Sequence, residues 1–248
     1  MLLRHILGRI RWRALEAFNR RDVNLYGNRP MVSFTFDDFP QSALYIGGAI
    51  LKNYGVRGTY YAAMGLMDKV NSLGRQFSAA DLKNLLRDGH ELGSHTFDHL
   101  SCRSTSFQDF QANVIKGMKA IDRLSGGGLP QQFSYPKGHA LFRGKRKIGA
   151  VFSSCRGIIP GINESPVDLN LLRANSLYSC CFDIEVISRL FEANERCRGW
   201  LIFYTHDISD NPSSFGCKPE DFESVVNLAV KKQNIILPVG QVLLGASH

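Results

Sequence analysis

The sequence lacks several features that would point to other classes of protein. No apolar run reaches the roughly 18 residues that a membrane-spanning helix needs. None of the 6 cysteines forms a C-x-x-C pair, which argues against a zinc finger or a disulfide framework. No low-complexity tract or evident linker divides the 248 residues. This length suits one large domain, and a composition that is 44% hydrophobic can bury a core of useful size.

The N-terminal segment is short of acidic residues and has no continuous apolar stretch of the kind found in secretory signals. Between Met1 and Arg21 it carries one acid, Glu16, and its apolar residues recur at helical spacing among arginines. The pattern predicts a basic amphipathic helical extension over residues 1–29. Such a helix packs on its own domain or contacts an anionic membrane surface or an acidic partner.

The net charge of +8 raises the question of nucleic-acid binding, but the chain has no recognition motif, so no nucleic-acid partner is expected. Because no signal sequence is evident, the expected location is the cytoplasm, or a peripheral position at the inner face of the membrane. Reduced thiols are the default in that compartment.

Strand and helix patterns alternate from residue 30 onward. Apolar or β-branched runs predict strands at 31–36, 58–63, 91–94, 131–136, 150–154 and 200–207. Helical periodicity marks 42–54, 78–89, 106–126, 183–196 and 219–233. The run at 171–177 is ambiguous, and 157–170 is the longest apparent loop. About seven strand–helix repeats predict an α/β fold, a distorted (β/α) barrel of parallel strands over residues 30–248.

Polar residues follow four of the predicted strands. In a barrel, chemistry gathers at the carboxyl ends of the strands, so these residues are expected to face one site. They are Asp37 and Asp38, His95 and His99, Lys137 and Gly138, and His206 and Asp207.

This group of side chains suits a hydrolytic metal site. His95 and His99 are four residues apart, which places both imidazoles on one face of a helical turn. Zinc in hydrolases commonly takes three His, Asp or Glu ligands and keeps one position for water, whose pKa it lowers to roughly 7. One aspartate can complete such a set while the other accepts the water's proton. His206 is a candidate acid for the leaving group.

Other interpretations of the same residues remain open. The Asp pair can cap the helix that follows, and His206 can bond a backbone carbonyl at a strand end. Two histidines and a carboxylate also suit Fe(II) in an oxygenase, and the ligand set accommodates Co, Ni, Mn or Fe as well as Zn.

Four short motifs together resemble the polysaccharide deacetylases, the carbohydrate esterase group with the NodB-homology domain. They are TFDD (35–38), SHTFDH (94–99), YPKG (135–138) and FYTHD (203–207), and the resemblance covers roughly residues 31–240. It implies metal-dependent hydrolysis of an N-acyl group, usually acetyl, from an amino sugar in a saccharide or glycolipid. The partner it implies is a carbohydrate.

The resemblance also implies roles for individual residues. Asp38, His95 and His99 match the metal ligands, Asp37 matches the catalytic base, and His206 matches the general acid. The backbone N–H of Lys137 would help to hold the oxyanion. Tyr135 and Pro136 would line the substrate groove.

The chain departs from the family pattern at the residue that orients the base. Many members carry an arginine in the third motif, where this sequence has Ser134. Candidate replacements are Arg156, Asp168, Arg173 and Asp207. The usual Asp-Trp fourth motif is not evident.

These departures bear on the substrate and leave two alternatives. One is an amidohydrolase of the same fold acting on a small cyclic imide, ureide or formylated amino sugar, which a loop at 157–170 closing the groove would favour. The other is a non-catalytic sugar-binding module.

Overall fold

The computed structural model describes residues 15–25 and 29–245, and its centre is a curled parallel sheet. Hydrogen bonding along the sheet follows the order β10-β11-β2-β3-β6-β7-β8, with β12 beside β2. The strands are β10 (Asn175–Ser176), β11 (Trp200–Thr205), β2 (Met31–Asp38), β3 (Thr59–Ala62), β6 (Glu91–Ser94), β7 (Gln132–Ser134), β8 (Ser154–Arg156) and β12 (Ile235–Ile236). The predicted distorted (β/α) barrel is confirmed.

The segment at 171–177, whose sequence was ambiguous, joins the two ends of this sheet. Leu172 forms a parallel bridge with Arg156 at the end of β8, and β10 pairs with β11 three residues later. A single bridge and a two-residue strand close the circle, which explains why the barrel is distorted.

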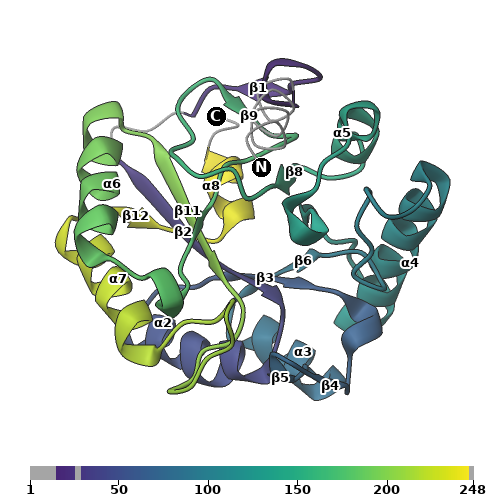
Figure 1. Ribbon diagram of the computed structural model, residues 1–248, viewed down its shortest axis with the longest axis horizontal. Helices are drawn as coiled ribbons and strands as arrows, with labels where there is room; N and C mark the ends of the chain where they lie inside the picture. Colours follow the sequence, from purple (N-terminus) through teal and green to yellow (C-terminus); the bar gives the residue numbers. More distant parts are fainter. Residues whose placement is uncertain (1–14, 26–28, 246–248) are drawn as a thin grey trace, which may run out of the picture.

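Helices cover the outside of the curled sheet (Figure 1). They are α2 (Ala49–Asn53), α3 (Ala79–Arg87), α4 (Phe107–Ser125), α5 (Phe142–Gly149), α6 (Ile184–Cys197) and α7 (Pro219–Lys231), and a π-helical stretch at Ala43–Gly48 precedes α2. Helix α8 (Val239–Gly245) lies instead against the starts of β3 and β6, where its first backbone N–H groups bond Thr59 and Glu91. Ser78 and Asp81 form a capping box at the start of α3, and α4 ends at Gly126 in the left-handed conformation. These local signals are why both helices lie where the sequence predicted them.

Three local predictions need correction. The strand expected at 150–154 begins only at Ser154, because α5, which the sequence did not reveal, occupies residues 142–149. A small hairpin of β4 (Val70–Asn71) and β5 (Gly74–Arg75) interrupts the segment before α3. The loop at 157–170 contains β9 (Val167–Asp168), which pairs with β1 (Asp22–Val23).

The sheet is buried on both faces, as a parallel sheet covered by helices requires. All eight residues of β2 are buried. Phe36 on β2 stacks against Tyr60 on β3, with ring centroids 4.6 Å apart. A Cβ atom at Gly47 would lie 2.9 Å from the Phe36 ring, so this glycine allows the π-helical stretch to approach the sheet. The same packing fixes the carboxyl end of β2, where Asp37 and Asp38 lie.

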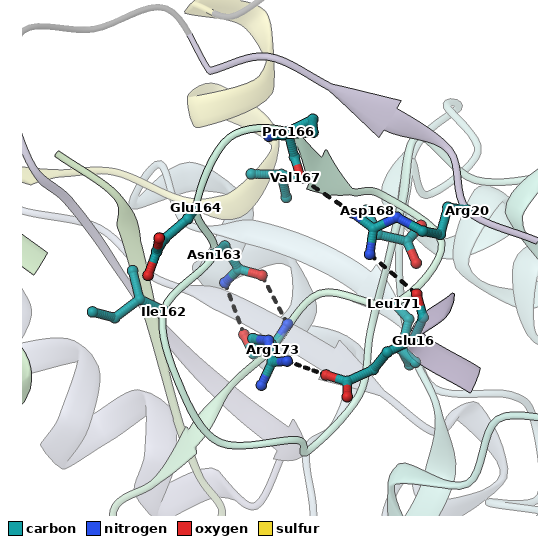
Figure 2. A pocket seen from close by; sticks show the side chains of 10 residues that line it. All are labelled: Glu16, Arg20, Ile162, Asn163, Glu164, Pro166, Val167, Asp168, Leu171 and Arg173. Carbon is teal, nitrogen blue, oxygen red and sulfur yellow. Dashed lines mark hydrogen bonds and ion pairs between the residues drawn. The ribbon is translucent and has the colours of Figure 1, made fainter. Parts of the chain in front are cut away.

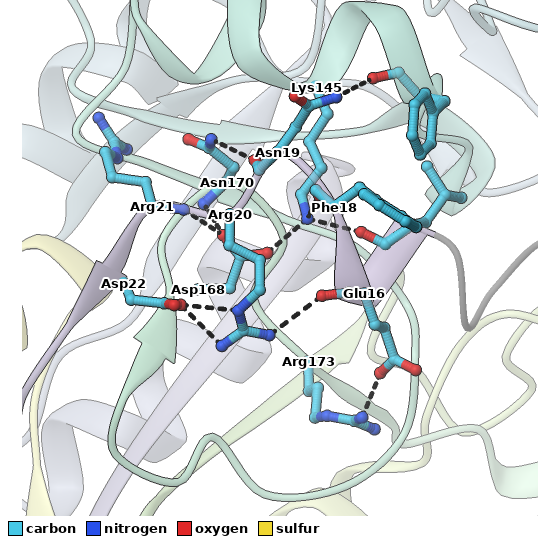
Figure 3. A network of polar contacts seen from close by, with 12 residues as sticks. Glu16, Phe18, Asn19, Arg20, Arg21, Asp22, Lys145, Asp168, Asn170 and Arg173 are labelled. Carbon is cyan, nitrogen blue, oxygen red and sulfur yellow. Dashed lines mark hydrogen bonds and ion pairs between the residues drawn. The ribbon is translucent and has the colours of Figure 1, made fainter.

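Residues 15–25 are part of the folded domain (Figure 3). Lys145 is fully buried, and its Nζ donates to the carbonyl oxygens of Leu15 at 2.6 Å and Phe18 at 3.0 Å. The same Nζ lies 2.5 Å from a carboxylate oxygen of Asp168. Residues 1–14, which hold most of the predicted basic helix, lie outside the described residues. None of the helices in the described part of the chain is long and apolar enough to cross a membrane.

Candidate active site

The carboxyl ends of β2, β6 and β7 meet in a region of unusual backbone conformation. Five non-glycine residues there have positive φ angles between 53° and 65°. They are Asp38, Phe39, Thr96, His99 and Lys137. Such conformations are costly for residues with a Cβ atom and cluster at functional sites, where the surrounding fold enforces them. At Asp38 the left-handed turn breaks the alternation of the strand, which would otherwise point Asp37 and Asp38 to opposite faces.

Helix α4 holds the loop that carries the two histidines. The side-chain oxygen of Asn113 accepts the backbone N–H groups of Phe97 and Asp98, each at 2.9 Å. A Cβ atom at Gly117 would lie 2.7 Å from the carbonyl of Thr96, so only glycine lets the loop pack this closely on the helix. These contacts turn the H-x-x-x-H segment toward β2.

Asp38, His95 and His99 form the one cluster of potential metal ligands among the described residues 15–25 and 29–245. Their ligand atoms all lie within 4.8 Å of one another. The Nε2 atoms of His95 and His99 are 3.7 Å and 3.4 Å from Oδ1 of Asp38. Nδ1 of His95 lies 2.7 Å from the carbonyl oxygen of Ser134. A carbonyl can only accept, so Nδ1 carries the proton and the Nε2 lone pair faces Asp38.

The protonation states of these three side chains suit the binding of a cation. Burial lowers the pKa of His95 to about 3, and burial also lowers the pKa of His99, so both imidazoles are neutral at pH 7. Burial raises the pKa of Asp38 to about 6. Its Oδ1 is buried and has no hydrogen-bond donor. An orphaned carboxylate oxygen between two imidazole lone pairs is a donor set that a divalent metal ion satisfies.

The second carboxylate, Asp37, is held by a buried arginine. The Arg156 Nη2 forms an ion pair with Oδ1 of Asp37 and donates to the hydroxyl of Ser134 at 2.6 Å. The guanidinium lies between two aromatic rings, 5.1 Å from the centroid of Tyr61 and 4.9 Å from that of Tyr204. Burial alone would raise the pKa of Asp37, but the charge of Arg156, helped by His95 and His206, lowers it. Asp37 is therefore ionised at neutral pH.

Arg156 reaches this position because of strand register. Ser134 on β7 and Arg156 on β8 are direct partners in the parallel ladder. Ser134 stands where the motif of the resembled family has its arginine. The guanidinium thus comes from β8, the strand next to β7, at the same level of the barrel. Arg156 therefore takes the place of the arginine that the third motif lacks.

An open pocket of about 490 Å³ lies over the cluster. His206 lines it from the end of β11, and its Nδ1 lies 3.2 Å from the carbonyl oxygen of Phe215, which directs Nε2 away from that loop. Lys137 also lines it, from the turn after β7. The remaining lining residues are Asn71, Ser72, Leu73, Gly138, His139, Ile158, Tyr178, Tyr204 and Phe215, besides the carboxylates and histidines already described.

Other sequence-based site residues lie elsewhere. Tyr135 is 1% exposed, its ring packs against Phe133 at 5.1 Å in the core, and neither Tyr135 nor Pro136 lines the pocket. The strand carries the Tyr135 side chain to the face opposite the site, since its neighbour Ser134 points to Arg156.

Three of the four residues suggested to orient Asp37 pair with other residues instead. Asp168 pairs with Lys145, and Arg173 pairs with Glu16 beside a separate pocket (Figure 2). Asp207 accepts the hydroxyl and backbone N–H of Ser213 and braces the loop after β11. Only Arg156 contacts Asp37 among these candidates.

Sequence reasoning missed the aromatic and hairpin residues that shape the pocket. Tyr178 packs edge-on against Tyr204 at 5.6 Å and against Phe215 at 5.8 Å. The hairpin of β4 and β5 brings Leu73 to the rim. The turn at 71–74, with Gly74 at φ 94°, was the one local signal that could have indicated this hairpin.

Comparison with known proteins decides the family. The family model described as polysaccharide deacetylase matches residues 25–147, the segment that contains Asp37, Asp38, His95 and His99. The chain belongs to the polysaccharide deacetylase family. The match ends before β8, so Arg156 and His206 lie beyond it.

Individual relatives agree with this family. A chitooligosaccharide deacetylase from Azorhizobium caulinodans is 24% identical over 112 residues, which are 45% of this chain and 50% of that protein. A peptidoglycan-N-acetylglucosamine deacetylase from Listeria monocytogenes is 29% identical over 36% of this chain and 18% of that protein. The chain thus spans half or less of the length of these relatives.

Solved structures show the same fold. The structure of a family 4 acetyl xylan esterase from Clostridium thermocellum, in complex with a cobalt ion, superposes with a TM-score of 0.60. It is 17% identical and covers 86% of this polysaccharide deacetylase chain and 90% of the other. The superposition thus covers more of the chain than the family model, which matches residues 25–147.

Proposed function

We propose that this polysaccharide deacetylase is a metal-dependent hydrolase that removes an N-acyl group, in particular N-acetyl, from an amino sugar of a saccharide. One observation carries the proposal: an ionised carboxylate, Asp37, lies beside a separate set of three ligands with an orphaned oxygen on Asp38. A site for binding alone would have no use for the second carboxylate. The names of the curated relatives, which are deacetylases of amino sugars, support the same reaction.

Asp38, His95 and His99 would hold the metal. A divalent ion there supplies a Lewis acid that activates water and polarises the acyl carbonyl. Zinc suits two imidazoles and a carboxylate, and cobalt, nickel, manganese and iron suit them as well.

The chain's own residues then divide the proton transfers. Asp37, kept ionised by Arg156, accepts a proton from the attacking water, which adds to the acyl carbon. The backbone N–H of Lys137 donates to the carbonyl oxygen as negative charge develops on it. His206, which lines the pocket from the end of β11, gives a proton to the sugar nitrogen as the C–N bond breaks. The products are an amino sugar and a carboxylic acid.

Acetate release tests this function. Protein loaded with zinc or cobalt should release acetate from chitooligosaccharides or poly-N-acetylglucosamine and leave free amines on the sugar. His95→Ala should lose both the bound metal and the activity, because it removes one of three ligands. Stoichiometric zinc retained by that variant would refute the ligand assignment. Absence of acetate from every N-acetylated saccharide, with metal bound, would refute the function.

A further inference from the structure

A second pocket of about 540 Å³ adjoins the catalytic one. The two pockets share the residues 71–73, which form the turn of the β4–β5 hairpin. The loop after β11 is the other common border: it presents His206 and Phe215 to the catalytic pocket and Ser209 and Asn211 to the second one. A substrate that extends beyond the N-acylated sugar can therefore place its next residue across the hairpin.

The lining of the second pocket is polar, with one unpaired cation. Its charged members are Arg75 and Asp207. Both carboxylate oxygens of Asp207 already accept hydrogen bonds from Ser213, at 2.6 Å and 2.8 Å, and the residue is 5% exposed. The Arg75 side chain is in no ion pair or side-chain hydrogen bond of the described structure, and the residue is exposed. The remaining lining residues are Gln41, Ser42, Asn71, Ser72, Leu73, Gly74, Ser209, Asn211, Pro212 and Ser213.

The catalytic pocket shows the same imbalance of charge. Its two carboxylates are committed, Asp37 to Arg156 and Asp38 to the proposed metal position. Lys137 is exposed on its rim. Across the two pockets, Arg75 and Lys137 are exposed cations, whereas each carboxylate is already paired or assigned to the proposed metal. A groove lined in this way attracts an anionic glycan electrostatically, whereas a neutral glycan gains no such attraction.

We infer that the second pocket binds an acidic sugar residue of the substrate, with Arg75 as the counter-charge to its carboxylate. A guanidinium can hold a carboxylate through two parallel N–H bonds, and the neighbouring amides and hydroxyls match the hydroxyls of a sugar ring. This inference rests on the proposed deacetylase function. It specifies that function as acting on an anionic glycan, in which an acidic sugar adjoins the N-acetylated one.

Binding to an inactive form tests the inference without turnover. The probes are a tetrasaccharide of alternating N-acetylglucosamine and glucuronic acid, and its neutral counterpart with the carboxyl groups reduced to hydroxymethyl groups. Zinc-loaded Asp37→Asn protein, titrated by calorimetry, should bind the acidic probe about tenfold more tightly than the neutral one. Adding Arg75→Gln should abolish this preference, and adding Arg75→Lys should keep part of it, because lysine retains the charge without the planar fork.

Arg123→Gln in the same inactive background is the matched control. Arg123 lies on the exposed side of α4 and lines neither pocket, so its loss changes the net charge equally and should leave the preference intact. Equal affinity for the two probes, or a preference that survives Arg75→Gln, would overturn the inference.

Turnover by the wild-type protein separates this result from the proposed function. Arg75→Gln in the active protein should raise KM for the acidic probe toward that for the neutral probe, because Arg75 lines the second pocket and not the catalytic one. A loss of kcat equal for the two probes would show that Arg75 acts on the reaction itself and would overturn the inference. If neither probe nor any N-acetylated saccharide is deacetylated by the wild-type protein, the proposed function fails, while the binding preference still decides the role of Arg75.

Discussion

Two fully buried cations in this barrel each neutralise an aspartate, and the two pairs differ in what surrounds them. Arg156 pairs with Asp37 at the carboxyl end of the sheet, where the carboxylate lines an open pocket. Lys145 pairs with Asp168 beneath the N-terminal segment, and its other bonds go to backbone carbonyls (Figure 3). Both cations are 0% exposed.

The difference teaches how to separate a chemical ion pair from a structural one. The Lys145 ammonium contacts two backbone carbonyls and Oδ2 of Asp168, and Oδ1 of Asp168 accepts the backbone N–H groups of Arg21 and Asn170. The pair therefore joins residues 15–25 to α5 and β9, and both of its carboxylate oxygens are engaged within the fold. Asp37 keeps one oxygen for another partner, since only Oδ1 bonds Arg156. Burial and charge are alike in the two pairs, and each carboxylate lines a pocket, so the oxygen of Asp37 that has no partner in the described structure sets them apart.

The strongest contrast should come from removing each carboxylate charge in turn. Asp37→Asn should lower kcat for acetate release by roughly 10³-fold with metal still bound, because the amide cannot accept the proton. Asp168→Asn should leave kcat of the folded protein unchanged and lower the free energy of unfolding. Activity, bound zinc and urea unfolding measure the three quantities. Unchanged hydrolysis by Asp37→Asn would show that another base acts.

Removing the structural cation should cost stability. Lys145→Met leaves Asp168 buried without its counter-charge, and such losses destabilise proteins by about 3–5 kcal/mol. The matched control is Lys147→Met, on the same helix but exposed, which should change the free energy of unfolding by less than about 0.5 kcal/mol. Equal effects of the two variants in urea unfolding would show that the buried pair contributes nothing specific.

Moving the arginine that pairs with Asp37 from β8 to β7 tests whether its position in space or in sequence matters. Arg156→Ser should lower kcat/KM roughly 10- to 100-fold, since it removes the group that orients and ionises Asp37. The acid limb of the pH profile should also shift upward, because without the arginine the effect of burial, which raises the pKa of Asp37, dominates.

The double variant that combines Arg156→Ser with Ser134→Arg is the matched rescue experiment. Positions 134 and 156 are register partners on β7 and β8. An arginine at position 134 can therefore reach the space that Arg156 vacates. Most of the lost kcat/KM should return, and the acid limb should move back. A double variant no better than the single one would mean that the sandwich of Tyr61 and Tyr204 requires an arginine from β8.

These residues also show where sequence reasoning stops. The strands, the capped helices and the H-x-x-x-H segment depend on local patterns. Apart from the strand expected at 150–154, the structure has them where the sequence placed them, with the carboxylates beside the histidines. Arg156 and Asp37 are 119 positions apart, and their contact depends on the register of β7 with β8, which no local pattern encodes. Helix α5 was missed because FRGKRKIG contains two glycines and few apolar residues, and one of its buried positions is the charged residue Lys145.

A third buried carboxylate, Asp38, extends the comparison, because no lysine or arginine among residues 15–25 and 29–245 pairs with it. Burial therefore raises its pKa to about 6, whereas Arg156 lowers the pKa of Asp37. A metal ligand must be deprotonated, so zinc has to displace the proton of Asp38 below pH 6. Burial opposes protonation of both histidines, since it lowers the pKa of His95 to about 3 and also lowers that of His99.

The zinc dissociation constant should therefore rise about tenfold per pH unit below pH 6 and become nearly flat above it, with one proton released per ion. Calorimetry in buffers of different ionisation enthalpy measures both the constant and the proton count. Asp37→Asn is the control, because it removes the neighbouring charge that helps to raise the pKa of Asp38, and it should move the break to lower pH. A release of two protons would mean that one histidine is protonated in the metal-free protein besides Asp38, and Asp38 alone would then not set the pH dependence of the affinity.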